Sequence, residues 1–522
     1  MITFRYGIDR LTPGLALDIC KGRIRGELTS EAIERIYQNR AAVEQIVEDG
    51  TTVYGINTGF GPLCTTVISD EDTKKLQMNL LLSHAVGVGD PIPEEISRLM
   101  LILKVHSLAM GYSGISLNVM QRIMWHIDNR VTPCVPSQGS VGASGDLAPL
   151  AHLFLPLIGY GKVHYKNQIL PAIEVLQQFG LNALEAGPKE GLALINGTQF
   201  IAAFAVMFIE RFQNCLDHAD IIAAMNLEAM LGSVKAFDAA LHDLRPYRGS
   251  IYVADRMRKL TMDSEIVESH RNCHRVQDPY SLRCIPQVHG ASRNAYIHLK
   301  QLLTIELNSV TDNPIIFSKE KSISGGNFHG QLLALPLDYA AFAAAELGNI
   351  ADRRIYLSLM DSIDGLPKLL MKETGLNSGF MIPQYTTAAL VSENKTLCFP
   401  ASADSIPTSL GQEDHVSMGS ISARKALNII ENLEKIQGIE LFCASQAFDF
   451  RKPLKSGALI DACHHLVRKS IPHVDRDVYL GDYINTAIEI VRNHSLTELT
   501  TSMALDLNID FKNSLHELFG IY

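Results

Sequence analysis

The 522-residue sequence contains no cluster of basic residues and no long apolar run. Lys and Arg total 46 against 56 Asp and Glu, which gives a formal net charge of −10 at pH 7. No block of Lys or Arg is long enough to follow a phosphate backbone. The longest apolar stretches, such as 200–209 and 332–337, are too short to cross a bilayer or are interrupted by Asp338. We therefore expect neither a nucleic-acid partner nor a membrane association.

Paired cysteines are also missing. The nine cysteines are widely separated in the sequence, and none forms a Cys-x-x-Cys motif, which disfavours a disulfide framework and a thiolate zinc site. The first residues lack the basic region and apolar core of a signal peptide. Together these features predict a cytoplasmic protein in a reducing compartment.

Eighteen histidines raise the question of a metal site. His270 and His274 have the spacing of two ligands on one helical face, but the glutamate of a His-Glu-x-x-His zinc site is absent between them. His464 and His465 are adjacent, and adjacent residues on a helix point in different directions. We expect no catalytic metal.

The apolar pattern predicts a mainly α protein. Aromatic residues make up only 7% of the chain, so Ala, Leu and Ile must fill most of the core. Residues 30–49 form a predicted amphipathic helix, with Thr29 or Ser30 as its cap, and Gly50 ends it. We place Ile33, Ile36, Tyr37, Val43 and Ile46 on its apolar face.

From about residue 200 the helical spacing becomes sustained. Three long runs carry it: 204–222, 337–355 and 427–436. Such helices cannot bury their apolar stripes alone and must pack as a bundle, with subunits sharing it. We predict an N-terminal domain of mixed α and β elements over residues 1–200 and a long central helical bundle over residues 201–522.

The segment 139–152 is the most informative part of the sequence. A tight turn at Ala143-Ser144-Gly145 can bring the Gly145 nitrogen against the Ala143 carbonyl, and an unhindered glycine nitrogen attacks most easily. Ring closure with loss of water gives an imidazolone, and loss of the Ser144 hydroxyl gives an exocyclic methylene. The product is 4-methylideneimidazole-5-one, an electrophile that no ordinary side chain provides. The alternative is a plain glycine-rich turn before a helix at Asp146, which is the more frequent reading of Ala-Ser-Gly alone.

Six motifs, in order, carry a resemblance to the aromatic amino acid lyase family. They are segments 54–61, 139–152, 190–199, 277–284, 325–329 and 412–418. The resemblance runs from residue 54 to about residue 450 and implies the fumarase/aspartase-like fold. It also implies the prosthetic group formed from Ala143-Ser144-Gly145 without an external cofactor. A homotetramer with active sites shared between subunits follows too, in which the helical domain forms the core, the oligomer contacts and part of each site.

The resemblance also implies roles for individual residues. An elimination of ammonia needs an electron sink, a base near the β-carbon and a clamp on the carboxylate. Tyr54 matches the family's base, although a phenol with the ordinary pKa near ~10 must have that pKa depressed to act at neutral pH. Arg283 can hold a carboxylate with two hydrogen bonds, and Asn196 can bond the carboxylate or the ring carbonyl. The remaining family positions are Gln277, Tyr280 and Phe328. Taken singly, each of these residues fits an ordinary core or loop position equally well.

The substrate rests on four residues. Ser83, His84 and Met381 match the histidine-specific members, although some tyrosine lyases also carry Ser-His. Glu413 discriminates better, because a carboxylate can accept a hydrogen bond from an imidazole but is a costly unpaired charge beside a phenyl ring. The prediction is elimination of ammonia from the small amino acid L-histidine to give trans-urocanate. The alternatives are a tyrosine or phenylalanine ammonia-lyase, an aminomutase, and an inactive relative kept as a scaffold.

Overall fold

The computed structural model describes residues 3–522 except 60, 64–67, 273–274 and 512–513. The chain forms two compact units that are discontinuous in sequence. Unit 1 comprises Met1–Met207, Lys300–Asp338 and Pro400–Arg424, and unit 2 comprises Phe208–Leu299, Tyr339–Phe399 and Lys425–Tyr522. The division of roles expected at residue 200 stays a prediction.

Unit 1 holds every strand among the described residues, in small two- and three-stranded sheets. The pairs are β1 (Thr3–Arg5) with β2 (Arg25–Glu27), β3 (Val88–Pro91) with β5 (Pro136–Gln138), β4 (Thr132–Pro133) with β6 (Lys162–Tyr165) and β7 (Gln168–Pro171), and β8 (Ile315–Ser318) with β9 (Lys321–Ile323). Helices surround these sheets: α1 (Pro13–Lys21), α2 (Ser30–Glu48), η1 (Gly61–Leu63), α3 (Asp70–His84), α4 (Glu94–Leu108), α5 (Leu117–Asp128), α6 (Leu147–Phe154), η2 (Leu155–Ile158), α7 (Ala172–Gln178), α8 (Glu190–Ile195) and η5 (Ser409–Gly411). The mixed α and β content predicted for the N-terminal part is confirmed.

Helix α2 shows how the sequence sets local structure. Thr29 caps it by accepting a hydrogen bond from the Ala32 nitrogen, as Thr at this position commonly does. Its buried face follows helical spacing through Ala32, Ile36, Asn39, Val43 and Ile46. The placement of Tyr37 on that face is wrong, because its position one residue after Ile36 turns the ring outward, and 53% of it is exposed.

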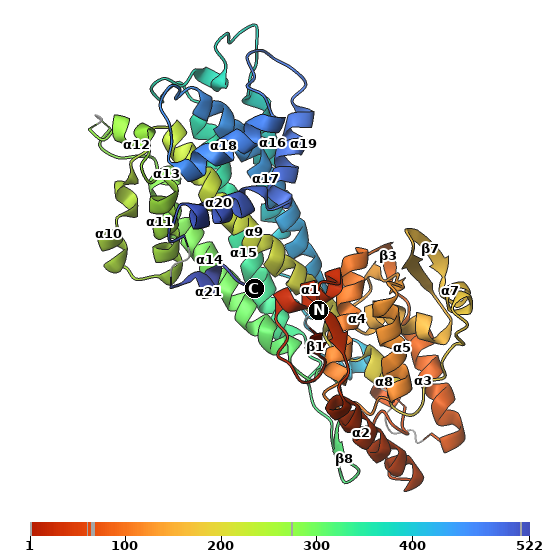
Figure 1. Cartoon of the computed structure of the whole chain (residues 1–522). Coiled ribbons are helices and arrows are strands. Elements are labelled where there is room, and N and C mark those ends of the chain that lie inside the picture. Colours follow the sequence, from red (N-terminus) through yellow and green to blue (C-terminus); the bar gives the residue numbers. More distant parts are fainter. Residues whose placement is uncertain (1–2, 60, 64–67, 273–274, 512–513) are drawn as a thin grey trace. The chain divides into compact units, whose positions relative to one another are not determined.

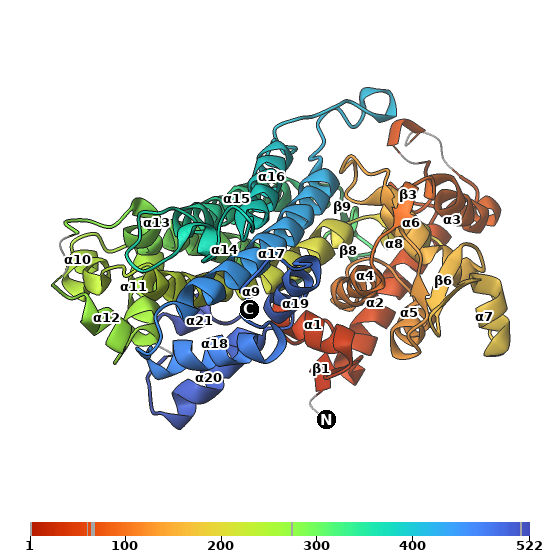
Figure 2. The ribbon, with the colours of Figure 1, turned by 90° about the horizontal axis from the view of Figure 1, so that it is seen from above.

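The regular elements among the described residues of unit 2 are all helices. It contains most of α9 (Gln199–Ala229), α14 (Ile285–Leu307), α15 (Gln331–Ser358) and α17 (Gly419–Asp449), which run alongside one another in Figures 1 and 2. Shorter elements complete it: η3 (Val234–Phe237), α10 (Ala239–Asp243), α11 (Arg248–Leu260), α12 (Glu265–Ser269), α13 (Tyr280–Arg283), η4 (Lys368–Leu370), α16 (Met381–Leu397), α18 (Ala458–Ser470), α19 (Gly481–Arg492), α20 (Ser495–Asp506) and α21 (His516–Phe519). The mainly α class and the long helical bundle are confirmed.

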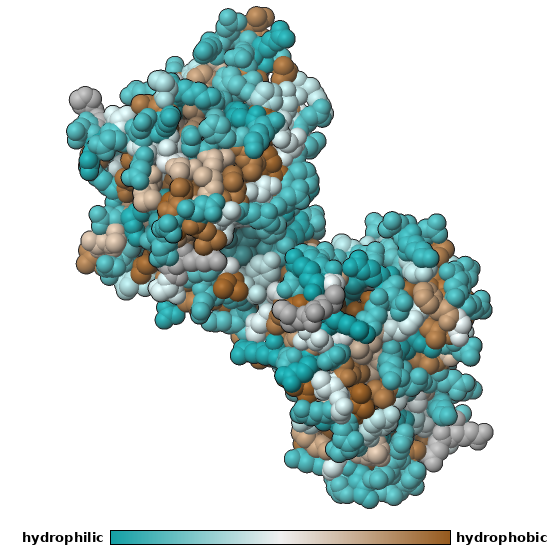
Figure 3. All heavy atoms as spheres, viewed as in Figure 1, coloured by the Kyte–Doolittle hydropathy of each residue, from teal (hydrophilic) through white to brown (hydrophobic). Residues whose placement is uncertain are grey.

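The three predicted runs lie in α9, α15 and α17, and most of their apolar residues are buried. The C-terminal parts of these helices share a hydrophobic core with α11, α18 and α20. Pro336 lies inside α15, near its start. In the view of Figure 3 both units present mostly hydrophilic residues, with hydrophobic ones in separate groups. No helix in the described part of the chain is long and apolar enough to cross a membrane.

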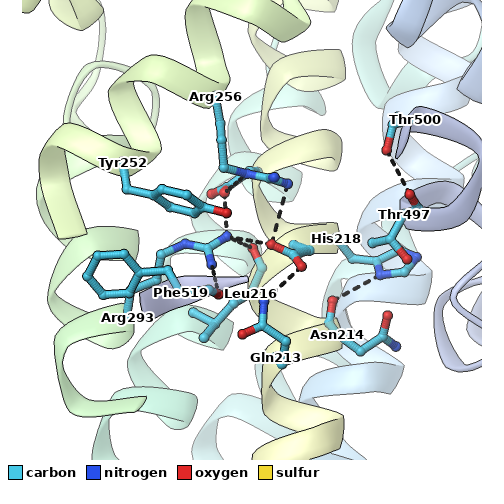
Figure 4. A network of polar contacts seen from close by, with 12 residues as sticks. Gln213, Asn214, Leu216, His218, Tyr252, Arg256, Arg293, Thr497, Thr500 and Phe519 are labelled. Carbon is cyan, nitrogen blue, oxygen red and sulfur yellow. Dashed lines mark hydrogen bonds and ion pairs between the residues drawn. The ribbon is translucent and has the colours of Figure 1, made fainter. Parts of the chain in front are cut away.

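The bundle also encloses a network of charges. The guanidinium groups of Arg256 and Arg293 converge on one place between the helices (Figure 4). Each contacts Asp220, at 2.8 Å from the Arg256 Nε and 2.6 Å from an Arg293 nitrogen. Burial alone would raise the pKa of Asp220, but the neighbouring Arg293, His289 and Arg256 hold that pKa well below its usual range. Asp217 also contacts both guanidinium groups, so two carboxylates balance the two cations.

Candidate active site

The segment that carries Ala143-Ser144-Gly145 is a loop tied to distant parts of unit 1. It follows β5 and leads into α6. The Val141 carbonyl accepts a hydrogen bond from the Met418 nitrogen at 2.9 Å, and the Ser420 hydroxyl donates to the Ser140 carbonyl at 2.6 Å. The loop is thus held on one side by residues that directly precede and open α17.

Gly197 holds the other side of this loop. Its carbonyl accepts from the Asp146 nitrogen at 2.7 Å, and its nitrogen donates to the Ser144 carbonyl at 3.4 Å. Ser144 and Gly145 have φ of 50° and 78°, so two consecutive residues in the left-handed region curl the chain tightly. A Cβ on Gly145 would lie 2.2 Å from the Gly197 carbonyl oxygen. Glycine at 145 is therefore required by the packing.

Asp146 fixes the end of the loop. Its Oδ2 accepts hydrogen bonds from the nitrogens of Phe200 and Ile201, at 3.0 and 3.1 Å, in the first turn of α9. A carboxylate at a helix N-terminus satisfies amides that have no partner in the helix. Burial raises the pKa of Asp146 to about 7, although those two hydrogen bonds oppose the rise. The loop is anchored directly to the longest helices of the chain.

A cavity of about 290 Å³ opens beside Ser144. This volume is at the lower end of the ~300–1,000 Å³ typical of small-molecule sites. Apolar residues Leu76, Leu80, Leu147, Leu192 and Ile195 form much of its wall. Its polar lining consists of Tyr54, Asn79, Ser83, His84, Ser144, Ser409 and Glu413. Five of the residues singled out from the sequence therefore meet in one cavity of unit 1.

Glu413 lies next to Ser144 in the wall of this cavity. The Ser144 hydroxyl donates to Glu413 Oε1 over 3.4 Å, a long hydrogen bond. The other carboxylate oxygen accepts from the hydroxyls of Ser409, at 2.7 Å, and Thr408, at 3.1 Å. These two hydroxyls orient the carboxylate and leave Oε1 directed toward the cavity. Glu413 does not cap the following helix, because α17 begins only at Gly419.

Ser83 and His84 end helix α3 at the cavity wall. The Ser83 hydroxyl and the His84 Nδ1 lie 3.0 Å apart. Burial lowers the pKa of His84, whereas a hydrogen bond to the Leu80 backbone and the charge of Glu413 oppose that shift. The imidazole of His84 is therefore favoured in its neutral form at neutral pH.

Tyr54 approaches the cavity from a turn before η1. Its hydroxyl oxygen accepts a hydrogen bond from the Gly61 nitrogen at 3.3 Å. The neighbouring Gly55 has φ of 75°, and a Cβ there would lie 2.4 Å from the Leu192 side chain, so glycine lets this turn pack against α8. Phe60, within the same motif, lies outside the described residues.

Asn196 and Phe328 belong to unit 1 but do not line the cavity. Asn196 is buried at the end of α8, directly before Gly197, and no described donor reaches its Oδ1. Phe328 is half-buried in the segment before α15. The structure thus brings Asn196 next to the peptide that holds the loop and leaves Phe328 outside the cavity.

The other four predicted residues belong to unit 2. Arg283 in α13 stacks over the Tyr280 ring at 4.5 Å, and its Nε donates to the Asp278 carbonyl at 3.0 Å. Gln277 and Tyr280 are exposed, so this group presents one cation and two polar side chains at the surface of unit 2. Met381 is the half-buried first residue of α16. Among its described lining residues, the unit 1 cavity contains no Lys or Arg that could bind a carboxylate.

A larger cavity of about 510 Å³ in unit 2 is lined by Asp217, Arg256 and residues of α20. Asp217 and Arg256 contact each other within the network described above, and Asp510, also in the wall, lies 4.0 Å from Lys259. In the described part of the chain no group of three His, Cys, Asp or Glu could hold a metal ion. Both ring nitrogens of His270 contact backbone carbonyls, of Ile266 and Gly232, and its suggested partner His274 lies outside the described residues.

The sequence did not indicate every residue of this site. Thr408 and Ser409 orient Glu413 but belong to a loop without a recognisable motif. Ser409 and Leu410 have φ of 50° and 56°, a backbone conformation that is unusual for residues of these types. No sequence pattern predicts it. Asn79 lies on α3 one turn before Ser83, so helical spacing could have identified it.

Comparison with known proteins assigns this chain to a family. Residues 11–469 match the aromatic amino acid lyase family. A histidine ammonia-lyase from Natranaerobius thermophilus is 49% identical over 467 residues, covering 89% of this chain and 92% of the relative. The chain therefore belongs to the aromatic amino acid lyase family and is a carbon–nitrogen lyase.

Solved structures share the fold over essentially the whole chain. The histidine ammonia-lyase from Trypanosoma cruzi superposes with a TM-score of 0.90 at 39% identity, covering 100% of this chain and 97% of that structure. The tyrosine aminomutase from Streptomyces globisporus gives the same TM-score at 32% identity, covering 96% and 99%. The fold is thus shared by members with different substrates, and the choice of substrate depends on the site.

Proposed function

We propose that this protein eliminates ammonia from L-histidine to give trans-urocanate. The observation that carries the proposal is the carboxylate of Glu413, held by two hydroxyls beside Ser144 in the cavity wall. An imidazole N–H can donate to this carboxylate, whereas a phenyl ring would leave it unpaired. The 49% identical relative is a histidine ammonia-lyase, which supports the same substrate.

We also propose that Ala143-Ser144-Gly145 condenses to 4-methylideneimidazole-5-one. The tight curl at Ser144 and Gly145 and the close approach of Gly197 fit this ring. The buried Asn196 Oδ1, which lacks a described donor, fits a site with a further polar group nearby. When formed, the group supplies an electron sink for the amino group of the substrate.

The chain's own residues then have distinct tasks. Tyr54, in its phenolate form, takes a proton from the β-carbon, since it lines the same cavity as Ser144. Glu413 binds the imidazole and sets its direction, and His84, favoured as a neutral ring, shares the wall with Ser83. The leucines of the wall exclude water around the reacting atoms. Arg283 binds the carboxylate, with Gln277, Tyr280, Phe328 and Met381 as further substrate contacts.

Incubation of the purified protein with each candidate substrate tests this function. We expect ammonia and the ultraviolet absorbance of a conjugated acid from L-histidine, and little of either from tyrosine or phenylalanine. Ammonia from tyrosine alone would reject the proposal in favour of a tyrosine lyase, and a β-amino acid product would indicate an aminomutase. No turnover in a protein that has lost no water would indicate an inactive scaffold.

Replacement of Glu413 by Gln tests the specificity. The amide retains the size but loses the charge, so we expect kcat/KM for histidine to fall about 10- to 100-fold, the effect of one hydrogen bond to a charged group. Asn79→Ala is a suitable control, because Asn79 lines the cavity without contacting Glu413 in any described hydrogen bond. An equal loss for histidine and for a slow aromatic substrate would contradict the recognition role.

We propose that the protein is a cytoplasmic homotetramer with shared active sites. On unit 2, five large apolar residues of α15 and α16 are 41–60% exposed: Tyr339, Phe342, Tyr356, Ile382 and Tyr385. Large exposed apolar residues of this kind favour burial by another protein surface. The missing carboxylate clamp in the unit 1 cavity supports contribution of Arg283 from another copy. The seven described cysteines are free.

Co-expression of two inactive variants tests site sharing. Tyr54→Phe and Arg283→Ala remove groups from different units, and we expect each to be nearly inactive alone. If one site draws these residues from two copies, random mixing restores about a quarter of the sites. Activity of the purified mixed oligomer, compared with the two variants mixed after separate purification, is the measurement. No recovery in a proven mixed oligomer would show that both residues come from one copy.

A further inference from the structure

Lys104 is a fully buried lysine in the middle of an apolar helix. From Leu99 to Leu108 every residue of α4 is buried, and Lys104 is 2% exposed. Burial lowers the pKa of Lys104 to about 7, although the charges of Asp312 and Asp146 oppose the shift. Within the described residues no ion pair involves this ammonium group. An apolar residue of the same length would avoid the desolvation of the amine, so a packing role alone does not account for lysine here.

Its single described hydrogen bond points to the loop of the tripeptide. Lys104 Nζ donates to the carbonyl oxygen of Asn196 at 2.5 Å. That carbonyl belongs to the same peptide group as the Gly197 nitrogen, which donates to the Ser144 carbonyl. The peptide group is planar and rigid. A donor that fixes its oxygen therefore also fixes the direction of its N–H.

The contact also has an electrostatic consequence. Hydrogen bonds in a chain polarise one another, and the effect is larger where water is excluded. An amine on the Asn196 oxygen draws electron density from the peptide, and the Gly197 N–H becomes a better donor to Ser144. Lys104 therefore contacts the Asn196 carbonyl, and the N–H of the same peptide group, on Gly197, contacts the Ser144 carbonyl of the tripeptide that is proposed to condense.

We infer that Lys104 is a positioning residue for the condensation of Ala143-Ser144-Gly145. It holds the Asn196–Gly197 peptide against the Ser144 carbonyl, which orders the turn in which the Gly145 nitrogen attacks the Ala143 carbonyl. Two water molecules leave in that condensation, one from the ring closure and one with the Ser144 hydroxyl. The inference rests on the proposed function, in that the tripeptide must condense at all.

The replacement Lys104→Met tests this role. Methionine fills a similar volume but donates no hydrogen bond. We expect condensation to slow about tenfold or more, the loss that one hydrogen bond from a charged group produces. The measurement is the fraction of freshly synthesised protein that has lost two water molecules, followed over time by intact-mass spectrometry. Turnover per dehydrated molecule should stay near the wild-type value, so kcat corrected for the mature fraction separates positioning from a catalytic role.

Lys189→Met is the matched control. Lys189 is also fully buried in unit 1, but its ammonium pairs with Asp312 at 2.8 Å and has no described contact to Asn196 or Gly197. Its loss leaves a buried carboxylate without its partner, which destabilises the fold at least as strongly. We expect the folded part of this variant to dehydrate at the wild-type rate, so slow maturation of Lys104→Met alone cannot be attributed to lower stability.

The outcomes separate the two proposals. Wild-type protein with the full encoded mass would overturn the prosthetic group itself. Normal dehydration of Lys104→Met, with wild-type protein dehydrated, would overturn only the role of Lys104. If Lys104→Met does not fold, Lys104→Gln keeps a neutral donor on a shorter chain, and its folded fraction should mature more slowly than wild type. Equal rates for that variant and the wild type would also overturn the inference.

Discussion

Ser144→Ala should leave a folded protein that has no measurable ammonia-lyase activity. Alanine cannot lose a hydroxyl, so the exocyclic methylene cannot form. We expect the loss to exceed the ~10²–10⁴-fold typical for removal of a general base, because the reaction loses its electron sink entirely. The measurements are ammonia release from histidine and the intact mass, which should show the loss of at most one water molecule, because alanine has no hydroxyl to eliminate.

Ser140→Ala is the control for this replacement. Ser140 lies in the same loop, and its hydroxyl accepts a hydrogen bond from the Gly142 nitrogen at 3.1 Å. Its loss weakens the loop but leaves the tripeptide intact, so both dehydration and turnover should persist. An active Ser144→Ala protein would contradict the proposed electrophile, and circular dichroism distinguishes a chemical defect from a failure to fold.

Tyr54→Phe should lower kcat for histidine by about 10²–10⁴-fold, the usual contribution of a positioned general base. KM should change much less, since the ring keeps its place in the cavity wall. The mass of this variant should still show the loss of two water molecules, because the tyrosine hydroxyl contacts Gly61 and not the tripeptide in the described hydrogen bonds. This pattern separates the loss of a base from the loss of the electrophile.

Tyr112→Phe serves as a matched replacement in unit 1, since Tyr112 packs against Phe317 and does not line the cavity. Its kinetics should equal those of the wild type. A Tyr54→Phe protein with unchanged kcat would reject Tyr54 as the base and direct attention to the other titratable groups of the wall, Glu413 and His84.

The long helices could be predicted because their burial repeats over many turns. Phe204, Phe208 and Phe212 all lie on the buried side of α9, and no competing arrangement satisfies that spacing. Spacing alone is less decisive beside the buried face of α2, where Tyr37 follows the buried Ile36 but is itself exposed. The discontinuous units were not predictable from periodicity, because helices such as α9 and α15 cross from one unit to the other without a break in pattern.

The residues of the site that belong to recognisable sequence motifs could be predicted. The cavity brings together Tyr54, Ser144 and Glu413, which are far apart in sequence. The residues that support them could not be found in this way. Lys104 acts through a backbone oxygen, and Thr408 and Ser409 act through hydroxyls in a loop whose shape depends on packing. Contacts to main-chain atoms, and contacts within irregular loops, are not marked by a recognisable sequence motif.

The tie between the Ser140 carbonyl and the Ser420 hydroxyl has a bearing on biosynthesis. Its two ends are 280 residues apart, so a ribosome has made most of the polypeptide before the second end emerges. A nascent chain that stops short of α17 lacks this restraint on the tripeptide. If the tripeptide condenses as proposed, the enzyme acquires its electrophile only after the chain has folded to completion. Chains truncated before α17 would therefore lack the electrophile.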